Sequence, residues 1–319
     1  MKELGLLELI NNTLSNNSLL GDDCAYLKNL GIFITQDSLI EDIHFSLSTT
    51  NAYNLGIKSL MVNLSDIAAS LSLPEYATIS LSIPQYLDEV FIRDFYRGVN
   101  DTCSKIGLKI AGGDITGSDK LFISVCAIGK KACDHLSGRK YANPGDYIIT
   151  TGTYGSSACG LYCLQNNIKS TEKIITKHIA PTARLKESEI LRSNITKNIA
   201  LMDTSDGLID ALYKIANSSG CKLEVSLEQI PFDKDIVQIA QQSNINYKNW
   251  IMWGGEDYEL LACIEKETYL KLPKDKFTLI GKVCEKKTGG EVIIKDNDTE
   301  TVVNREVFEE KSYNHFERK

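Results

Sequence analysis

The 319-residue sequence has no excess of positive charge and no long apolar run. Lys and Arg total 35 against 42 Asp and Glu, which gives a formal net charge of −7 at pH 7. Nucleic-acid binding depends on basic stripes that neutralise phosphates, so this balance argues against a nucleic-acid partner. A membrane-spanning helix needs about 18 or more consecutive apolar residues, which no segment provides. We therefore predict neither a nucleic-acid nor a membrane partner.

The nine cysteines show neither a Cys-x-x-Cys pair nor the spacing of a metal finger, and the four histidines contain no His-x-x-x-His pair. A zinc site is therefore disfavoured. The odd cysteine count does not fit a disulfide framework, and the N-terminus, with an acid at Glu3, does not fit a secretory signal. We expect a cytoplasmic protein with reduced cysteines.

Nucleotide-binding loops of the common kinds are also missing. Gly112 and Gly117 have the glycine spacing of a P-loop, but Ser118 occupies the place where that loop requires lysine. The chain has neither the His-Arg-Asp nor the Asp-Phe-Gly motif of protein kinases, and no Gly-x-Ser-x-Gly elbow. If the protein handles a nucleotide, metal ions must neutralise much of the phosphate charge.

Acids are abundant where the chain turns between short predicted strands. The segment from Gly21 to Phe45 holds five carboxylates among apolar residues that alternate as in strands: Asp22, Asp23, Asp37, Glu41 and Asp42. Two such charges about 4 Å apart would repel by roughly 4 kcal/mol at an effective dielectric constant near 20. If the acids converge, a cation must lie among them, and Mg²⁺ is the simplest candidate. The alternative is a set of solvated loop acids.

The pattern repeats later in the chain, which weakens that alternative. Most later acids lie beside a glycine, an apolar segment or both: Asp66, Asp114, Asp203, Asp206, Glu256 and Asp257. Glycine beside a carboxylate permits close approach of the backbone, which phosphate and metal sites require. Asp66 lies off the apolar stripe of a predicted helix, so that helix can pack while Asp66 faces a site.

The periodicity predicts a two-domain α+β protein, because the length suffices for two cores. Apolar residues at helical spacing predict long helices over 52–72 and 87–103, and alternation in Thr78–Ile83 predicts a half-buried strand. We expect an N-terminal domain, 1–135, with a mixed sheet covered by helices on one face. A polar segment then leads into a C-terminal α/β sandwich domain, 136–319.

These motifs, in this order, resemble the thiamine-monophosphate kinases, whose superfamily includes aminoimidazole-ribotide synthetase and selenophosphate synthetase. The resemblance runs from Gly21 to Tyr313 and rests most on Asn-Leu-Ser-Asp at 63–66 and Gly-Gly-Glu-Asp-Tyr-Glu-Leu at 254–260. It implies ATP-dependent phosphorylation of thiamine monophosphate to thiamine diphosphate, a step of thiamine diphosphate biosynthesis. It further implies direct in-line transfer assisted by several Mg²⁺ ions, and a homodimer formed by the N-terminal sheets. Thr78–Ile83 is the candidate strand for the dimer surface.

The resemblance also implies roles for individual residues. Asp66 and Asp206 are the expected catalytic residues, with Asp66 shared by several metal ions. The implied metal ligands are Asp23, Thr35, Gln36, Asp37, Asp66, Asp114, Asp203 and Asp206. The implied ATP contacts are Gly113, Asp114, Arg139 and Ser205, and the implied thiamine contacts are His44, Glu256 and Tyr313. An aromatic face near the thiazolium cation would add cation–π attraction.

The sequence departs from the family pattern in three places. A hydroxyl residue of the metal motif is replaced by Gln36, which can bind Mg²⁺ through its amide oxygen or its backbone carbonyl. The Gly-Gly-Asp string lacks its usual arginine and ends at Ser118, and Pro-x-Pro-Arg is replaced by 181–184, Pro-Thr-Ala-Arg. None of these changes removes a core carboxylate.

Two alternatives remain open at the level of sequence. One is a sibling ATP-dependent synthetase of the same superfamily. Selenophosphate synthetases usually carry a reactive cysteine or selenocysteine ahead of the acidic motif, whereas the first cysteine here, Cys24, lies inside it. The other alternative is a metal-dependent phosphohydrolase or a nucleotide sensor that uses the same acids.

Overall fold

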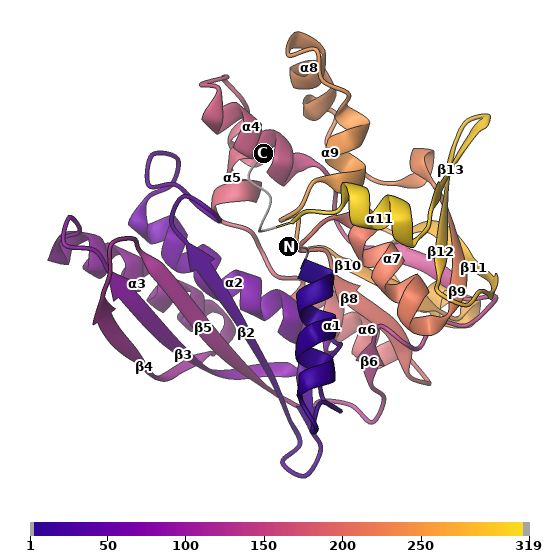
Figure 1. Cartoon of the computed structure of the whole chain (residues 1–319), viewed down its shortest axis with the longest axis horizontal. Coiled ribbons are helices and arrows are strands. Elements are labelled where there is room, and N and C mark those ends of the chain that lie inside the picture. Colours follow the sequence, from indigo (N-terminus) through magenta and orange to yellow (C-terminus); the bar gives the residue numbers. More distant parts are fainter. Residues whose placement is uncertain (1–2, 315–319) are drawn as a thin grey trace.

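A computed structural model describes residues 3–314, in which two β-sheets with their helices form the two halves of the molecule (Figure 1). No helix among these residues is both long and apolar enough to cross a lipid bilayer. Residues 1–2 and 315–319, which the predicted domain limits include, lie outside the described residues. All nine cysteines lie within them, and every one is a free thiol.

The first sheet has five strands in the order β1-β2-β5-β3-β4. They are β1 (Ala25–Leu27), β2 (Ile32–Ile40), β3 (Leu73–Ile83), β4 (Lys109–Gly117) and β5 (Phe122–Lys130). Strands β3 and β4 are parallel, and the other neighbours are antiparallel. The predicted mixed sheet is confirmed.

Helices α2 (Ala52–Ala69) and α3 (Glu89–Ile106) cover one face of this sheet, and the other face is open (Figure 1). The two helices cross closely at Gly56 and Gly98, where an added Cβ would lie 2.1 and 2.0 Å from a main-chain oxygen of the facing helix. Helix α2 is buried around most of its circumference, not only along the predicted stripe. The reason is that elements of the second half, including β8 and α6, pack on its other side.

The second sheet has eight strands in the order β13-β12-β9-β11-β7-β10-β8-β6. They are β6 (Ser137–Gly138), β7 (Tyr147–Thr150), β8 (Ile199–Asp203), β9 (Cys221–Ser226), β10 (Leu260–Ile264), β11 (Thr278–Lys286), β12 (Glu291–Asp296) and β13 (Thr299–Val303). In chain order, β5 is the last strand of the first sheet and β6 is the first strand of the second sheet. This change of sheet supports the division into 1–135 and 136–319, which stays a prediction.

The helices of this half pack largely on the second sheet and beside it. They are α4 (Ser156–Gln165), α5 (Glu172–Ile179), α6 (Leu185–Asn194), α7 (Leu208–Ser219), a 3₁₀ turn at Leu227–Gln229, α8 (Asp235–Gln242), α9 (Tyr247–Trp253), α10 (Lys266–Lys271) and α11 (Arg305–Lys311). Residues of α7 join strands β9, β11 and β12 in the largest buried cluster of the protein. Short helices α9, α10 and α11 were not anticipated from the sequence.

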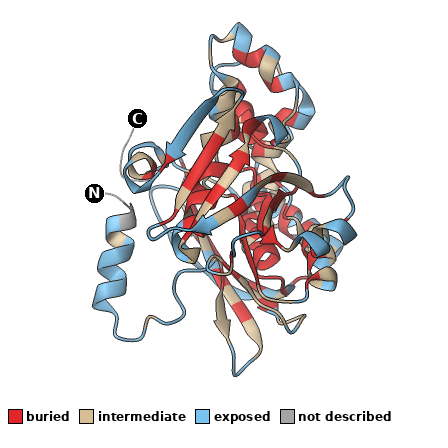
Figure 2. Cartoon of the chain, turned by 90° about the vertical axis from the view of Figure 1, so that its right-hand side faces the viewer, coloured by how far each residue is buried: buried red, intermediate tan, exposed pale blue. Residues whose placement is uncertain are grey.

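Helix α1 (Glu3–Thr13) differs from the rest because it is exposed over most of its length (Figure 2). Its Glu8 pairs with Arg305 of α11, at 2.9 Å between Oε1 and Nη2. This ion pair connects two segments from opposite ends of the chain.

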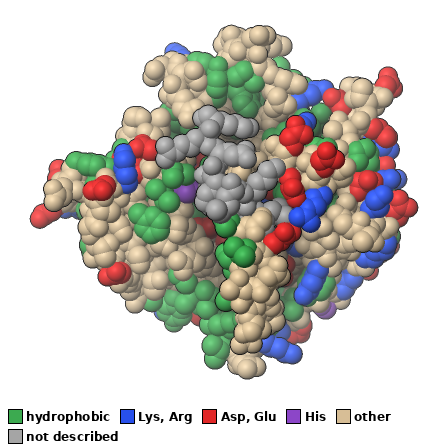
Figure 3. Space-filling view, in the orientation of Figure 1, with side chains coloured by type: hydrophobic (Ala, Val, Ile, Leu, Met, Phe, Trp, Pro, Cys, Tyr) green, Lys and Arg blue, Asp and Glu red, His purple; other side chains and the backbone are tan. Residues whose placement is uncertain are grey.

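Strand β4 is the free edge of the first sheet, and all nine of its residues are exposed. The strand expected at the dimer surface, Thr78–Ile83, lies in β3, which has β5 on one side and β4 on the other. Only the open face of β3 is therefore available to a partner. That face shows few charged side chains, whereas the second half carries many of both signs (Figure 3).

Candidate active site

Three aspartates from different elements form the wall between two cavities. Asp37 lies on β2, Asp66 on α2 and Asp203 at the end of β8, and we call these three the aspartate cluster. A smaller cavity of about 590 Å³ and a larger one of about 830 Å³ are both lined by the cluster, together with Ser205 and Asp206. Ligands in the two cavities would therefore meet at the aspartates.

Hydrogen bonds between elements hold this wall in place. The main-chain N–H of Asp37 donates to Asn63 Oδ1 at 2.9 Å, which ties β2 to α2. Thr35 Oγ1 donates to Asp66 Oδ2 at 2.5 Å. Asp203 ends a fully buried strand, in register with Leu260 of β10, and is itself only 2% exposed.

The aspartate cluster is electrostatically uncompensated. Burial above all, then repulsion from neighbouring acids, raises the pKa of Asp37 to about 6 and raises the pKa of Asp66 and Asp203 well above the usual range. Among residues 3–314, no Lys, Arg or His forms an ion pair with these three, and Asp203 Oδ2 lacks a hydrogen-bond partner. When ionised, acids in this arrangement favour a bound cation.

The donor set fits Mg²⁺, which prefers oxygen ligands and is commonly held by one or two carboxylates together with substrate phosphates. Within the described part of the chain, no three carboxylate, imidazole or thiol groups already converge on one metal position. The aspartates instead lie along a wall that both cavities share. A ligand phosphate would therefore have to complete the coordination.

The larger cavity also contains basic groups. Arg139 Nη2 lies 2.6 Å from Asp23 Oδ1, and the Arg139 main-chain N–H donates to Asp22 Oδ1 at 2.7 Å. Lys214 Nζ lies 3.0 Å from Asp206 Oδ2 and 2.6 Å from an oxygen of Asp210. This cavity can therefore offer both fixed cations and carboxylates to a phosphate chain.

The smaller cavity is lined by more apolar and aromatic side chains, including Trp253 and Tyr258. His44 Nδ1 accepts a hydrogen bond from the Ile40 main-chain N–H at 3.0 Å, which orients the ring. Glu256 carries a charge there, because Lys58 and His178 outweigh the effect of burial and lower its pKa to about 2. The cavity thus suits a ring compound with a cationic or hydrogen-bond-donating group.

A protein of Bacillus subtilis described as thiamine-monophosphate kinase is 33% identical to this chain, over 99% of this chain and 100% of its own length. The chain belongs to the thiamine-monophosphate kinase family. Residues 21–130 also match the family model of the AIR synthase related protein, N-terminal domain.

Solved structures of the family have the same fold. The structure described as AaThiL complexed with AMPPCP and TMP has a TM-score of 0.85 and 31% identity, and the match covers 99% of this chain and 97% of that one. The thiamine monophosphate kinase of Aquifex aeolicus has a TM-score of 0.81 and 32% identity, with 92% and 97% covered. The two-domain α+β fold expected from the sequence is confirmed.

Most residues that the family resemblance pointed to lie around the two cavities. His44, Glu256 and Tyr313 line the smaller one, and Tyr313, which is 54% exposed, lines both. The larger cavity is lined by the expected metal and nucleotide residues Asp23, Thr35, Gln36, Asp37, Asp66, Arg139, Asp203, Ser205 and Asp206.

Two of the family-implied residues are not brought to either cavity of the single chain. Gly113 and Asp114 lie on the exposed edge strand β4, in register with Ile79 and Ser80 of β3. Their roles in nucleotide and metal binding stay predictions. Gln36 lies at the larger cavity, but its side-chain amide donates to Ser124 Oγ at 3.1 Å, which favours its backbone carbonyl as the ligand.

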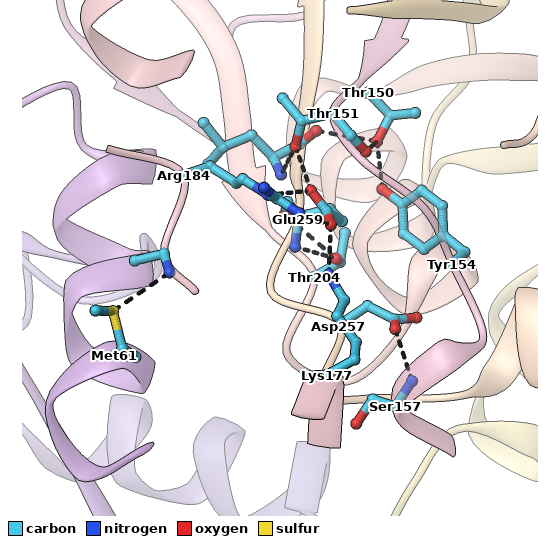
Figure 4. Close-up of polar contacts among 12 residues, drawn as sticks. Met61, Thr150, Thr151, Tyr154, Ser157, Lys177, Arg184, Thr204, Asp257 and Glu259 are labelled. Carbon is cyan, nitrogen blue, oxygen red and sulfur yellow. Dashed lines mark hydrogen bonds and ion pairs between the residues drawn. The ribbon is translucent and has the colours of Figure 1, made fainter. Parts of the chain in front are cut away.

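The acids of the family motif at 254–260 differ from the aspartate cluster in their hydrogen-bond and ion-pair partners. We call Glu256, Asp257 and Glu259 the paired acids, because each has fixed donors. Glu259 binds Lys177 at 2.5 Å and also binds Arg184, and Thr151 Oγ1 donates to it at 2.7 Å (Figure 4). Glu259 is fully buried, yet its pKa is lowered, since its cations outweigh the effect of burial.

Asp257 is satisfied by backbone groups instead of cations. It accepts a hydrogen bond from the main-chain N–H of Ser157 at 3.1 Å (Figure 4). The main-chain N–H of Gly155, just before α4, donates a second one at 2.7 Å. Burial nevertheless raises its pKa to about 7. Asp257 and Glu259 line neither cavity, so they can affect the site only through the residues that they bind.

Sequence reasoning missed three basic residues at the site: Lys58, His178 and Lys214. Lys214 had a weak signal, since it stands four residues after Asp210, the spacing of an ion pair within a helix, but such pairs are common on solvated surfaces. Lys58 and His178 had none. The structure alone shows their place at the site, because each forms an ion pair with Glu256, which belongs to a distant segment.

Proposed function

We propose that this protein transfers the γ-phosphoryl group of ATP to thiamine monophosphate, which yields thiamine diphosphate and ADP. The observation that carries this proposal is the wall of aspartates shared by two cavities. The relative structure complexed with AMPPCP, an analogue of ATP, and TMP supports it. One cavity per substrate with a common acidic wall suits a reaction in which two phosphates must approach each other.

The larger cavity suits the nucleotide, because Arg139 and Lys214 supply charged donors for phosphate oxygens. The smaller cavity suits the thiamine rings, with His44 and Tyr313 at its wall and Glu256 as an ionised acceptor for a hydrogen-bond donor of the rings. Bound Mg²⁺ ions, held by residues such as Asp23, Asp37, Asp66, Asp203 and Asp206, would neutralise the phosphate charge that the aspartates themselves repel.

Transfer is proposed to be direct, without a phosphorylated enzyme. The aspartate cluster consists of acids with raised pKa values that repel one another, and such acids serve better as cation ligands than as nucleophiles. A single in-line displacement inverts the configuration of a chiral γ-phosphorothioate, whereas a double displacement retains it. Retention, or a stable phospho-aspartate trapped in a single turnover, would contradict direct transfer.

Product analysis tests the function itself. The protein is incubated with ATP and Mg²⁺ and, in turn, thiamine monophosphate, thiamine and an aminoimidazole precursor. We expect ADP and thiamine diphosphate in equal amounts with the monophosphate alone. ADP with free phosphate and no thiamine diphosphate would instead identify a phosphohydrolase, and turnover of the aminoimidazole precursor would identify a sibling synthetase.

We further propose a homodimer in which the open face and free edge of the first sheet meet a second copy. The low charge of that face and the exposure of Ile110 and Ile115 on β4 support it. Asp114 would then act at the partner's site. Mixing the inactive variants Asp66→Asn and Asp114→Asn should restore up to about a quarter of wild-type activity, since heterodimers form one intact site. A monomer at micromolar concentration in sedimentation would contradict the proposal.

We also propose a cytoplasmic location, which the nine unpaired cysteines support.

A further inference from the structure

Lys58 is a buried lysine in the middle of α2, only 2% exposed, among apolar neighbours of the helix. Its Nζ lies 2.7 Å from Glu256 Oε1 and donates at 3.5 Å to the main-chain carbonyl oxygen of His44. Glu256 and His44 both line the smaller cavity, whereas Lys58 does not. Lys58 therefore contacts two cavity residues from behind, one in each half of the molecule.

A methionine at this position would fill similar space without the cost of burying a charge. The charge of Lys58 is therefore explained by its partner. Glu256 lies in the loop before β10 and has a left-handed backbone conformation, with φ of 64°, that a residue with a Cβ rarely adopts. Its main-chain N–H donates to the Ser205 carbonyl oxygen at 2.6 Å. Backbone and carboxylate of Glu256 are thus both anchored.

The second carboxylate oxygen of Glu256 is held as well. His178 Nδ1 lies 3.1 Å from Glu256 Oε2 and 3.2 Å from Ser157 Oγ. Ser157 is in turn positioned by Asp257 at the start of α4 (Figure 4). Glu256 nevertheless keeps 26% of its side chain exposed, and it lines the smaller cavity. The result is an anion with a fixed direction and free acceptor capacity toward a ligand.

We propose that Lys58 is a positioning residue for the thiamine substrate, holding the Glu256 carboxylate where it accepts a hydrogen bond from the amino group of the aminopyrimidine ring. This inference rests on the proposed function and concerns how the smaller cavity selects its ligand. Lys58 does not touch the substrate. Its effect passes through Glu256, and its contact to His44 keeps the opposite wall of the cavity in register.

The lowered pKa of Glu256 agrees with this role, since an acceptor must stay ionised at neutral pH. The arrangement also implies selectivity. In a ring with an oxo group in place of the amino group, a hydrogen-bond acceptor faces the Glu256 carboxylate, which is itself an acceptor. Neither the oxo oxygen nor the carboxylate then receives a hydrogen bond from the other, and binding is weakened. The oxo analogue, oxythiamine monophosphate, is therefore the natural probe.

The experiment measures binding of thiamine monophosphate by calorimetry to the full chain, without ATP, for wild type and Lys58→Met. We expect binding about 30-fold weaker in the variant, because hydrogen bonds to charged groups contribute factors of that order. AMPPCP affinity should change less than about twofold, and in turnover KM for thiamine monophosphate should rise far more than kcat falls.

The matched control is Lys177→Met. It removes the same charge from another buried carboxylate, Glu259, which lines neither cavity. Its melting temperature should fall while its affinity for thiamine monophosphate stays at the wild-type value. Equal loss of affinity in both lysine variants would show a general stability effect and overturn the inference.

A double-mutant cycle tests whether Lys58 acts through Glu256. The variant Lys58→Met/Glu256→Gln should bind thiamine monophosphate as weakly as Glu256→Gln alone. Both single variants should lose most of the preference for thiamine monophosphate over oxythiamine monophosphate. Independent, multiplying losses would mean that Lys58 acts by another route, and unchanged affinity in Lys58→Met would overturn the inference directly.

A second variant covers the case in which Lys58→Met does not fold. Lys58→Gln keeps a donor without the charge, and we expect it to weaken binding about 5- to 10-fold. Wild-type affinity in that variant would also overturn the inference. Failure of the proposed function looks different, because the wild-type protein itself would then neither bind nor phosphorylate thiamine monophosphate.

Discussion

The aspartate cluster and the paired acids both consist of buried and half-buried carboxylates, but only the paired acids are held by basic side chains or by backbone N–H groups. Glu256 and Glu259 are each held by two basic residues, and Asp257 by backbone N–H groups. In the cluster, Asp37 and Asp66 lie beside each other and beside Asp203, so burial and repulsion act together. Burial by itself thus says little about the role of an acid.

The difference follows from what each group does. A carboxylate paired with Lys or Arg is neutralised within the protein and can hold elements together. A buried carboxylate without a cation lowers stability unless a ligand brings the missing charge, so it persists where binding requires it. We therefore expect Asp257 and Glu259, which line neither cavity, to stabilise the fold around the cavities, and the aspartate cluster to act in the proposed reaction.

The largest effect is expected when the cluster loses Asp66. Asp66→Asn keeps the size of the side chain but removes a charge that faces both cavities, so phosphoryl transfer should fall by about 1,000-fold or more. The melting temperature without Mg²⁺ should stay level or rise, since repulsion from Asp37 and Asp203 is relieved. A coupled ADP assay and thermal unfolding measure the two quantities. Wild-type turnover at low Mg²⁺, or an unfolded variant, would contradict the assignment.

Among the paired acids, Glu259→Gln is expected to lose stability and to keep activity, the reverse of Asp66→Asn. The change leaves Lys177 and Arg184 without their carboxylate, so the free energy of unfolding should fall by about 3 kcal/mol. Urea unfolding measures the loss, and activity per folded molecule should remain. The matched cluster variant Asp203→Asn should lose activity but not stability. A stable, inactive Glu259→Gln protein would remove the distinction between the two groups.

The pH dependence of the metal-free protein should separate the acids that have a basic partner from those that have none. A folded-state pKa of about 6 for Asp37, against 3.8 ordinarily, means that its ionisation destabilises the fold as pH rises from about 4 through 6. Asp257, with a pKa of about 7, acts in the same direction. Glu256, with a pKa of about 2 against 4.5, adds stability that is complete above about pH 4.5 and is lost as pH falls toward 2.

Thermal unfolding in EDTA should therefore show greatest stability near pH 4.5 and a decline toward pH 8, on the order of 1–3 kcal/mol from Asp37. Mg²⁺ with ATP should reduce this decline in stability, because the bound ligands neutralise the charge of the aspartate cluster. The part of the decline that comes from Asp257 should remain, because the ligands do not reach that residue. Metal-free stability that climbs steadily from pH 5 to pH 8 would argue against an uncompensated cluster.

The smallest effect is expected at Gln36, next to the cluster in sequence. Its amide is bonded to Ser124 on the open face of the sheet, so Gln36→Ala should change the Mg²⁺ concentration for half-maximal activity by less than about twofold. A Mg²⁺ titration of initial rates measures this. A large rise in the required Mg²⁺ would show that the side-chain amide is a ligand.

Much of the fold was accessible from the sequence because its periodic signals are strong. The stripe in α2 and the alternation in β3 follow from local spacing, and both elements are present. Short helices such as α9 and α10 were missed, since seven and six residues carry too little periodicity to be distinguished from loops. The role of β3 at a dimer surface stays a prediction. Its place between β5 and β4 was not accessible from the sequence, because strand order in a sheet cannot be read from a strand's own residues.

The sequence by itself determined the family and the acids of the site, since strings such as Asn63–Asp66 and Gly254–Leu260 place specific residue types at specific spacing. Which of those acids are neutralised was decided only by the tertiary structure. Lys58 reaches Glu256, and Lys177 reaches Glu259, from distant segments, whereas no basic residue in the described chain reaches Asp37, Asp66 or Asp203 in an ion pair. The physical reason is that the energy of a buried charge depends on the groups within a few ångströms, and only folding selects those neighbours.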